Sequence, residues 1–271
     1  MTSILELSRH RELFANLTLR ELRGKYKRSA LGWGWSMVNP LAQMAIFSLV
    51  FGFFLKVKPP VGDPSGLEEF AFFLLCGLLP WTFLANGLTA GMGSLLANAN
   101  LVKKVWFPRQ LLVGATVSSF GVSFLIELGV LAVALLIVGN MIVPWIIPLL
   151  GVVVIQAAFV LGMALAFSVW NVYFRDLEYL VGIALQFWFY ATPIVYPISV
   201  VEKALEDQPG LLTAYRLNPM TRFVEVYRDL FYSLRLPALG TVAYLVVCAA
   251  VSLAIGWVAF DRLQGRLAEE L

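Results

Sequence analysis

Residues 110–174, QLLVGATVSSFGVSFLIELGVLAVALLIVGNMIVPWIIPLLGVVVIQAAFVLGMALAFSVWNVYF, contain a single charged side chain, that of Glu127. A helix that crosses the roughly 30 Å hydrocarbon core of a bilayer needs about 20 apolar residues. This stretch is too long for one crossing, and Gly139, Asn140 and Pro144 near its middle favour a turn. The pattern therefore predicts two successive transmembrane helices.

The rest of the chain is also dominated by apolar runs. Hydrophobic residues make up 60% of the 271 residues and charged residues 14%, whereas a soluble domain is about half apolar and about a quarter charged. Each of the remaining uncharged runs is long enough to span a bilayer: 29–55, 70–102, 179–201 and 236–260. We therefore expect six spans in one transmembrane domain, 1–271, with a leader (1–38), a core (39–261) and a tail (262–271).

The basic residues predict how the spans are oriented. Lys and Arg accumulate in the short cytoplasmic flanks of membrane helices. Seven of them precede the first span, and three more lie in 103–109 without an acidic residue. With Arg175 and the tail that side carries thirteen, whereas basic and acidic residues nearly balance on the other. Both termini are expected in the cytoplasm, and the charged leader is not expected to be a signal peptide.

Residues 4–27 predict an amphipathic helix, because Phe14, Leu17 and other apolar residues recur at helical spacing beside charged ones. Such a helix lies in the headgroup layer with its apolar face toward the acyl chains, either as an anchor only or with a role in receiving substrate. The basic cluster at its end comprises Arg23, Lys25, Lys27 and Arg28. The cluster marks the cytoplasmic side, and it also suits binding of a lipid carrier's diphosphate through charge-assisted hydrogen bonds.

Two further polar features lie near the second and third predicted spans. A short amphipathic piece that docks into a soluble partner, or only closes a loop, contains Asn98, Asn100, Lys103 and Lys104. Glu127 lies inside a span, where an ionisable group is costly and often functional. It belongs either to a substrate or proton pathway or to a hydrogen-bonded helix contact. The absence of a second acid or histidine at helical spacing favours the helix contact.

The run 179–201 is interrupted by Thr192-Pro193 and Tyr196-Pro197. Proline lacks a backbone N–H and ends or kinks a helix. We therefore expect the fifth span to break at membrane depth, which is tolerated where the backbone is buried in protein or lines a wet cavity.

Asn218-Pro219 predicts the start of another helix, since proline suits the first helical turn. The expected apolar face comprises Met220, Phe223, Val224, Tyr227, Phe231 and Leu234, and the charged face Arg222, Glu225, Arg228 and Asp229. The fold class is thus all-α, a polytopic membrane protein with six transmembrane helices, an N-terminal interface helix and a re-entrant external hairpin between spans five and six.

Several kinds of chemistry lack the residues they need. No stretch matches the P-loop pattern, so ATP is expected to bind to another subunit. His10 is the only histidine, and no clustered acids or CxxC pair suggest a metal site or catalytic triad. Cys76 and Cys248 fall in predicted spans and are expected to act as small apolar residues. We expect no cofactor and no enzymatic activity in this chain.

The order of the motifs resembles a known family. It is carried by Arg20-Glu21-Leu22, by Ser29-x-Leu31-Gly32-x-x-Trp35-x-x-x-Asn39-Pro40, by Arg175-Asp176, by Thr192-Pro193-Ile194 and by Leu217-Asn218-Pro219-Met220. Over nearly the whole chain this pattern is similar to the permeases of ATP-binding-cassette polysaccharide exporters, which export O-antigen, teichoic acid or capsule.

The resemblance implies a homodimer in the bacterial plasma membrane, bound to two ATPase subunits that carry ATP and Mg. The substrate would be a glycan on an undecaprenyl-diphosphate-type lipid, with no nucleic acid involved. The leader helix and the piece with Asn98, Asn100, Lys103 and Lys104 would contact the ATPases. The channel would be lined by Phe187, Trp188, Tyr190 and Tyr196, and the external gate would comprise Pro193, Pro197, Asn218, Pro219, Phe223 and Tyr227.

Two other functions remain compatible with the sequence. One is a related ATP-driven permease for a drug or small lipid. The other is a membrane-embedded scaffold or lipid-modifying enzyme.

Overall fold

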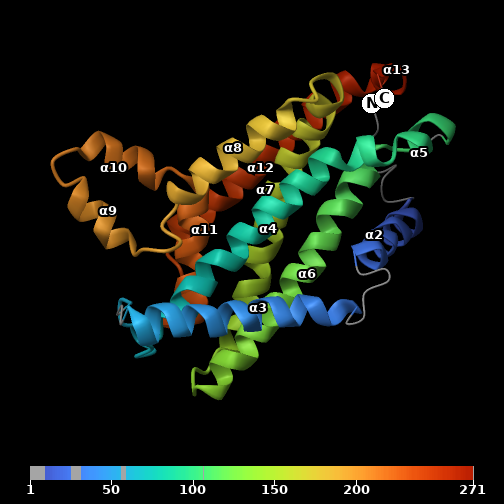
Figure 1. Ribbon diagram of the computed structural model, residues 1–271. Coiled ribbons are helices and arrows are strands. Elements are labelled where there is room, and N and C mark those ends of the chain that lie inside the picture. The colour runs from blue at the N-terminus through green and yellow to red at the C-terminus, as the bar shows by residue number, and fades with distance from the viewer. Residues whose placement is uncertain (1–9, 26–31, 56–58, 106, 271) are drawn as a thin grey trace.

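A computed structural model describes residues 10–25, 32–55, 59–105 and 107–270, and within these ranges the regular elements are helical (Figure 1). Their bounds are α2 Arg11–Lys25, α3 Trp35–Phe47, α4 Phe70–Ala97, α5 Ala99–Lys104, α6 Gln110–Ile137, α7 Ile146–Tyr173, α8 Leu177–Tyr190, α9 Ile198–Ala204, α10 Pro209–Arg216, α11 Pro219–Arg228, α12 Leu239–Leu263 and α13 Leu267–Glu270. π-Helical turns extend α3 to Phe54 and α11 to Ser233. The all-α expectation is confirmed.

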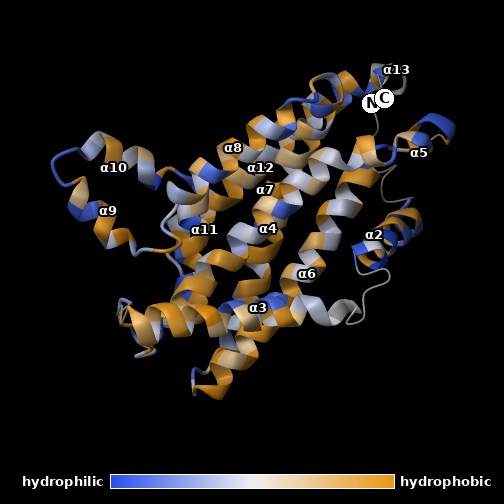
Figure 2. Cartoon of the chain, in the orientation of Figure 1, coloured by the Kyte–Doolittle hydropathy of each residue, from blue (hydrophilic) through white to orange (hydrophobic). Residues whose placement is uncertain are grey.

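Five helices are long and apolar enough to cross a membrane: Trp35–Phe54, Phe70–Ala97, Gln110–Ile137, Val143–Tyr173 and Leu239–Leu263. Figure 2 shows apolar residues along these helices and hydrophilic residues gathered in α5 and in the segment around α9 and α10. The two helices expected from residues 110–174 are α6 and α7. They are joined by a turn in which Gly139 adopts a φ of +88°, a conformation that favours glycine.

Five of the six expected spans are helices long enough to cross a membrane, and the fifth span along the chain is not. The apolar run 179–201 forms α8, which has 14 residues and is therefore about 21 Å long, short of the roughly 30 Å of hydrocarbon. The predicted break is confirmed, because α8 ends at Tyr190 and the next helix begins only at Ile198.

α4 lies at the centre of the bundle and contacts α6, α7, α8 and α11. Its approach to α7 depends on a small residue, because a Cβ on Gly91 would lie 2.8 Å from the Cβ of Ala164. Without a hydrophobic driving force between helices in lipid, such close van der Waals packing is a main source of association. Gly91 thus permits the close approach of α4 and α7.

α7 and α12 form another tight crossing in the bundle. A Cβ on Gly256 would collide with the carbonyl of Gly162, and a Cβ on Gly162 would collide with the backbone of Ser252 and Leu253. The Ser252 hydroxyl adds an interhelical hydrogen bond of 2.8 Å to the carbonyl of Phe159. The two backbones thus meet directly at this point.

The amphipathic helix expected in the leader is present as α2, and it packs against α6. The apolar face was expected to lie on acyl chains, but Leu17 and Leu22 are buried inside the protein. Gly114 makes room for this contact, because a Cβ there would lie 3.2 Å from the ring of Phe14. The leader helix is therefore attached to the helical bundle itself.

Candidate functional site

The end of α8 is the most irregular part of the bundle. After Tyr190 the chain turns through residues 191–197 before α9 begins, with Pro197 as the residue preceding that helix. Thr192, Pro193 and Ile194 are buried within this turn. Because Pro193 and Pro197 cannot donate backbone hydrogen bonds, the helix cannot continue regularly through them. The carbonyls of this segment consequently need partners from elsewhere in the protein.

Asn218 provides part of that support. Its Oδ1 accepts hydrogen bonds from the backbone N–H of Met220 (3.0 Å) and from the indole Nε1 of Trp188 (2.8 Å). Its Nδ2 donates to the carbonyl of Ala191 (3.0 Å) and to the hydroxyl of Thr192 (3.1 Å). Asn218 therefore caps α11, which starts where the sequence predicted, and at the same time it attaches α11 to the end of α8.

Arg228 supports the next part of the break. Its Nη1 and Nη2 donate to the carbonyls of Pro193 and Ile194, both at 2.7 Å, and its Nε donates to the carbonyl of Phe73 at 3.3 Å. The guanidinium also lies 3.6 Å from the centre of the Phe73 ring, a cation–π contact. Three parts of the chain, α4, the broken segment and α11, meet at this side chain.

Arg228 does not lie on a charged face beside Arg222 and Glu225, so the prediction from its helical spacing is wrong. Its side chain is 8% exposed, whereas the ion pair expected on that face forms between Arg222 and Glu225 at 3.0 Å. The reason is the tertiary fold, which brings the carbonyls of Pro193, Ile194 and Phe73 to the position that the Arg228 side chain reaches.

The predicted gate residues separate into two groups. Pro193, Pro197, Asn218 and Pro219 lie at the break and at the start of α11, as expected. Phe223 and Tyr227 are instead fully buried in the bundle. The Phe223 ring packs on Phe159 with centroids 5.8 Å apart, and the Tyr227 hydroxyl donates to Gln156 Oε1 at 2.8 Å.

Gln156 is a residue that the sequence analysis missed. It lies on α7, accepts from Tyr227, and donates through Nε2 to the carbonyl of Pro80 at 2.8 Å. α11 is thereby linked through α7 to α4. A lone amide in the middle of an apolar run was the signal that could have identified it, because buried polar groups in a membrane helix require partners.

The predicted channel aromatics also point in different directions. Phe187 and Tyr190 are 74% and 67% exposed in the isolated chain. Trp188 packs edge-on against Trp81 with centroids 5.9 Å apart. Tyr196 donates to the carbonyl of Tyr190 at 2.5 Å. The four residues lie around the end of α8, and Phe187 and Tyr190 present open ring surface.

A recess of about 440 Å³ adjoins Arg228. Two ion pairs border it, Arg222 with Glu225 at 3.0 Å and Arg235 with Asp229 at 2.7 Å. Burial raises the pKa of Glu225, and the Arg222 guanidinium opposes this shift. The recess therefore combines the buried Arg228 guanidinium with two ion pairs at its border.

The segment predicted to contact the ATPase, which contains Asn98, Asn100, Lys103 and Lys104, lies at the end of α4 that is distant from Phe73 and Arg228. Asn98 links α4 to α5 and donates to the carbonyl of Ser94 at 2.9 Å, while its Oδ1 accepts from Arg20 of α2 at 2.7 Å. Lys103, Lys104 and Asn100 are exposed on α5. The structure thus joins the leader helix directly to the segment with Asn98, the two elements that the family resemblance implies would contact the ATPases.

The basic cluster at the end of α2 is only partly described, because Lys27 and Arg28 lie outside the described residues. Arg23 is exposed. Lys25 instead turns toward α6, with its Nζ 3.2 Å from the centre of the Phe120 ring and 3.5 Å from Ser123 Oγ. Burial lowers the pKa of Lys25 to about 8, and the charge of Glu127 opposes this shift. The charge of Glu127 on α6 thus favours the protonated form of Lys25 on α2.

Within the described ranges no group of three or more His, Cys, Asp or Glu side chains is placed to hold a metal ion. Cys76 and Cys248 are free thiols, the first of them buried.

Five helices that are long and apolar enough to cross a membrane define the class of protein: a multi-pass membrane protein. The chain belongs to the ABC-2 type transporter family, whose family model matches residues 12–232.

Three relatives illustrate this membership. The O-antigen export system permease protein RfbA of Myxococcus xanthus is 33% identical over 98% of this chain and 96% of its own length. The protein of the same name from Klebsiella pneumoniae is 31% identical over 96% of this chain and 95% of its own. The capsule polysaccharide export inner-membrane protein CtrC of Neisseria meningitidis serogroup A is 26% identical over 94% and 92% of the two chains. The family resemblance seen in the motifs is confirmed.

Proposed function

We propose that this chain is the membrane subunit of an ATP-driven exporter that moves a lipid-linked polysaccharide, such as an O-antigen, across the bacterial plasma membrane. The names of the full-length relatives support this substrate class, since they refer to export of O-antigen and capsule polysaccharide. ATP would be hydrolysed by a separate subunit, as the lack of a P-loop in the chain suggests.

The observation that carries the proposal is the secured break at the end of α8. Non-helical backbone at membrane depth is tolerated where protein satisfies its polar groups or where it borders a water-filled path. Here Asn218 and Arg228 satisfy the carbonyls of Ala191, Pro193 and Ile194 from α11. α8, the break and the hairpin from α9 to α11 together would form the sixth crossing and its external closure.

A second copy of the chain would complete the pathway. Tyr179, Ile183 and Phe187 recur every four residues on α8, and all three are more than half exposed in the isolated chain. An apolar stripe of this kind is covered by lipid or by another helix. In a homodimer the α8 helices would approach each other, and Phe187 and Tyr190 would offer ring faces on which the C–H groups of sugars can pack.

The other end of the molecule would receive the ATPase. Lys103 and Lys104 are exposed on α5, next to the hydrogen bond between Arg20 of α2 and Asn98. The excess of basic residues on this side supports a cytoplasmic location for both termini. A force applied to α5 would pass directly into α4, whose other end contacts Arg228.

The decisive experiment is reconstitution of the protein with its cognate ATPase in proteoliposomes that contain the lipid-linked glycan. We expect ATP-dependent movement of the glycan to the opposite leaflet, measured by accessibility to an added lectin. The charge reversal Lys103→Glu with Lys104→Glu should abolish glycan-stimulated ATP hydrolysis, whereas the charge reversal Glu68→Lys, at an exposed position before α4, should not. Absence of glycan movement by the intact complex would refute the proposal, and unaltered stimulation in the charge-reversed variant would refute the role of α5.

A further inference from the structure

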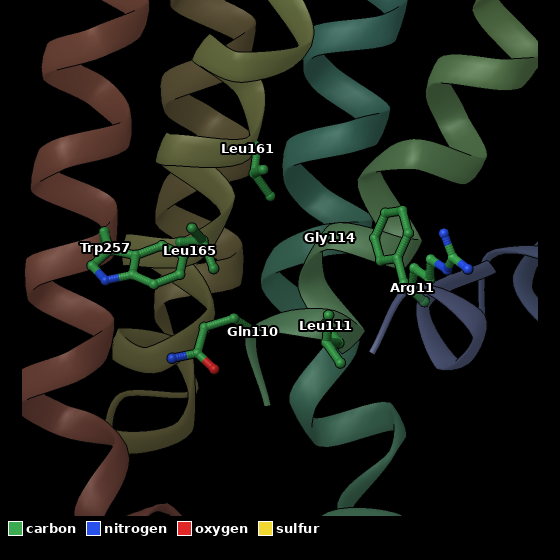
Figure 3. Close-up of a pocket in the computed structure, with 8 residues that line it drawn as sticks. Arg11, Gln110, Leu111, Gly114, Leu161, Leu165 and Trp257 are labelled. Carbon is green, nitrogen blue, oxygen red and sulfur yellow. The ribbon is translucent and has the colours of Figure 1, made fainter. Parts of the chain in front are cut away.

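An apolar cavity of about 300 Å³ lies between the leader helix and the bundle, where α2, α6, α7 and α12 meet (Figure 3). Its walls are formed by Phe14, Leu111, Leu161, Leu165 and Trp257. Figure 3 shows Trp257 and Leu165 on one side of the space and Arg11 on the other. The volume is at the lower end of the range found for ligand pockets.

Two glycine contacts explain why this space exists. The crossing of Gly162 and Gly256 draws α7 and α12 together, and the large neighbours Leu161 and Trp257 then project beside the crossing. On the other side, Gly114 admits the Phe14 ring and so fixes α2 at a set distance from α6. The leader helix therefore covers the cavity without filling it.

The cavity lies at a depth that matches the headgroup side of a lipid leaflet. Gly114 lies one turn from the start of α6, and Trp257 lies in the last two turns of α12, at the ends that also carry α5 and α13. With 1.5 Å per residue, these positions are about 6–9 Å inside the helix ends. That depth corresponds to the boundary between headgroups and acyl chains.

The mouth of the cavity carries positive charge. Arg11 lines it and has an exposed side chain, and the amide of Gln110 lies nearby. An apolar space with a cation at its opening, at this depth, fits one acyl chain below an anionic headgroup.

We propose that this cavity is a binding site for an anionic phospholipid of the same leaflet, which inserts one acyl chain beneath α2 and places its phosphate at Arg11. The lipid would fix the leader helix to α6, α7 and α12. This role differs from transport, because the bound lipid is a structural partner of the chain and not its cargo.

The test uses the full-length protein in nanodiscs made of equal amounts of phosphatidylglycerol and phosphatidylethanolamine. After transfer to detergent, native mass spectrometry counts the retained lipids. We expect preferential retention of phosphatidylglycerol. Leu161→Phe, which fills the cavity, should lower this retention about tenfold, whereas Val154→Phe on an exposed position of the same helix should leave it unchanged.

A second variant separates headgroup recognition from filling of the cavity. Arg11→Gln should reduce the preference for phosphatidylglycerol over phosphatidylethanolamine about fivefold, the effect of one basic residue near the membrane surface. Arg235→Gln, at the other end of the bundle, should not change it. Equal retention by Leu161→Phe and Val154→Phe, or retention of added polyprenyl phosphate in place of phosphatidylglycerol, would overturn the proposal. The readout is independent of glycan transport.

Discussion

The side-chain amide of Asn218 both caps α11 through its oxygen and holds the end of α8 through its nitrogen, and substitutions can separate these two roles. Asn218→Asp keeps the acceptor for Met220 and Trp188 but cannot donate to Ala191 and Thr192. Asn218→Ala removes all four hydrogen bonds. We expect losses of about 1–2 kcal/mol for the Asp variant and about 2–4 kcal/mol for the Ala variant, measured by denaturant titration in mixed micelles. Asn100→Ala, on the exposed side of α5, is the control, and an Asp variant as stable as wild type would contradict a role in holding the break.

Arg228 offers a second test at the scale of single residues. Arg228→Gln removes the fork that satisfies the carbonyls of Pro193 and Ile194, and we expect a loss of about 3 kcal/mol. Arg228→Lys should be nearly as unstable as Arg228→Gln, since an ammonium group cannot reproduce the planar fork of the guanidinium. The exposed Arg235→Gln should change stability by less than about 0.5 kcal/mol. If Arg228→Gln behaved like Arg235→Gln, the buried hydrogen bonds would not support the break.

Lys25 should make stability depend on pH. Burial lowers its pKa to about 8, below the ordinary value of 10.5, so the folded state disfavours the charged form. The unfolded chain then binds more protons between these two values, and stability rises with pH from about 8 to 10.5. Lys25→Met should therefore raise the midpoint of thermal unfolding at pH 7 and have a smaller effect at pH 10.

The charge of Glu127 provides the control for that experiment. Glu127→Gln removes the attraction that partly offsets the burial of Lys25, so its effect on the midpoint of thermal unfolding at pH 7 should be less favourable when Lys25 is present than in the Lys25→Met background. Destabilisation by Lys25→Met at pH 7 would show that the attraction to Glu127 outweighs the cost of burial.

At the scale of elements, the crossing of α7 and α12 is sensitive to a single methyl group. Gly256→Ala would force Cβ into the carbonyl of Gly162, and backbone atoms cannot move aside as a flexible side chain can. We expect a strong loss of correctly folded protein, measured as the monodisperse yield after purification. Gly151→Ala, where nothing lies within 4 Å, should be neutral or slightly stabilising. Similar yields of the two variants would show that the helices are not in direct contact.

For the whole molecule, the proposed orientation predicts which loops face the cytoplasm. In a background with Cys76→Ala and Cys248→Ala, a cysteine at Asn100 should react with a membrane-impermeant maleimide only after the cells are opened. A cysteine at Gln208, exposed between α9 and α10, should react in intact spheroplasts. Labelling of both positions from the same side would rule out the crossing formed by α8 and the hairpin.

The sequence predicted those features that depend on neighbouring residues. The start of α11 at Asn218-Pro219, the break at Thr192-Pro193 and the turn at Gly139 follow from local backbone chemistry, and each lies where it was expected. The length of α8 was overestimated, because hydropathy continues through a break that interrupts only the helix.

Features that depend on distant partners were not predicted. Arg228 finds its acceptors 34, 35 and 155 positions away, so its spacing within α11 suggested a surface ion pair instead. The contact of Gly162 with Gly256 was equally hidden, because glycine is common in membrane helices. The joining of α2 to α5 through Arg20 and Asn98 likewise depends on the tertiary fold.

The docking of α2 onto α6 has a consequence for biogenesis. The ribosome delivers α2 first and completes α6 only at Ile137, roughly 5–20 s later at about 5–20 residues per second. Throughout that interval the nascent helix has no protein groove to occupy, and the membrane surface is the only place that accommodates both its apolar and its basic side chains. The apolar side chains of α2 must therefore suit two environments in succession: the membrane surface during synthesis and the packed bundle in the folded subunit.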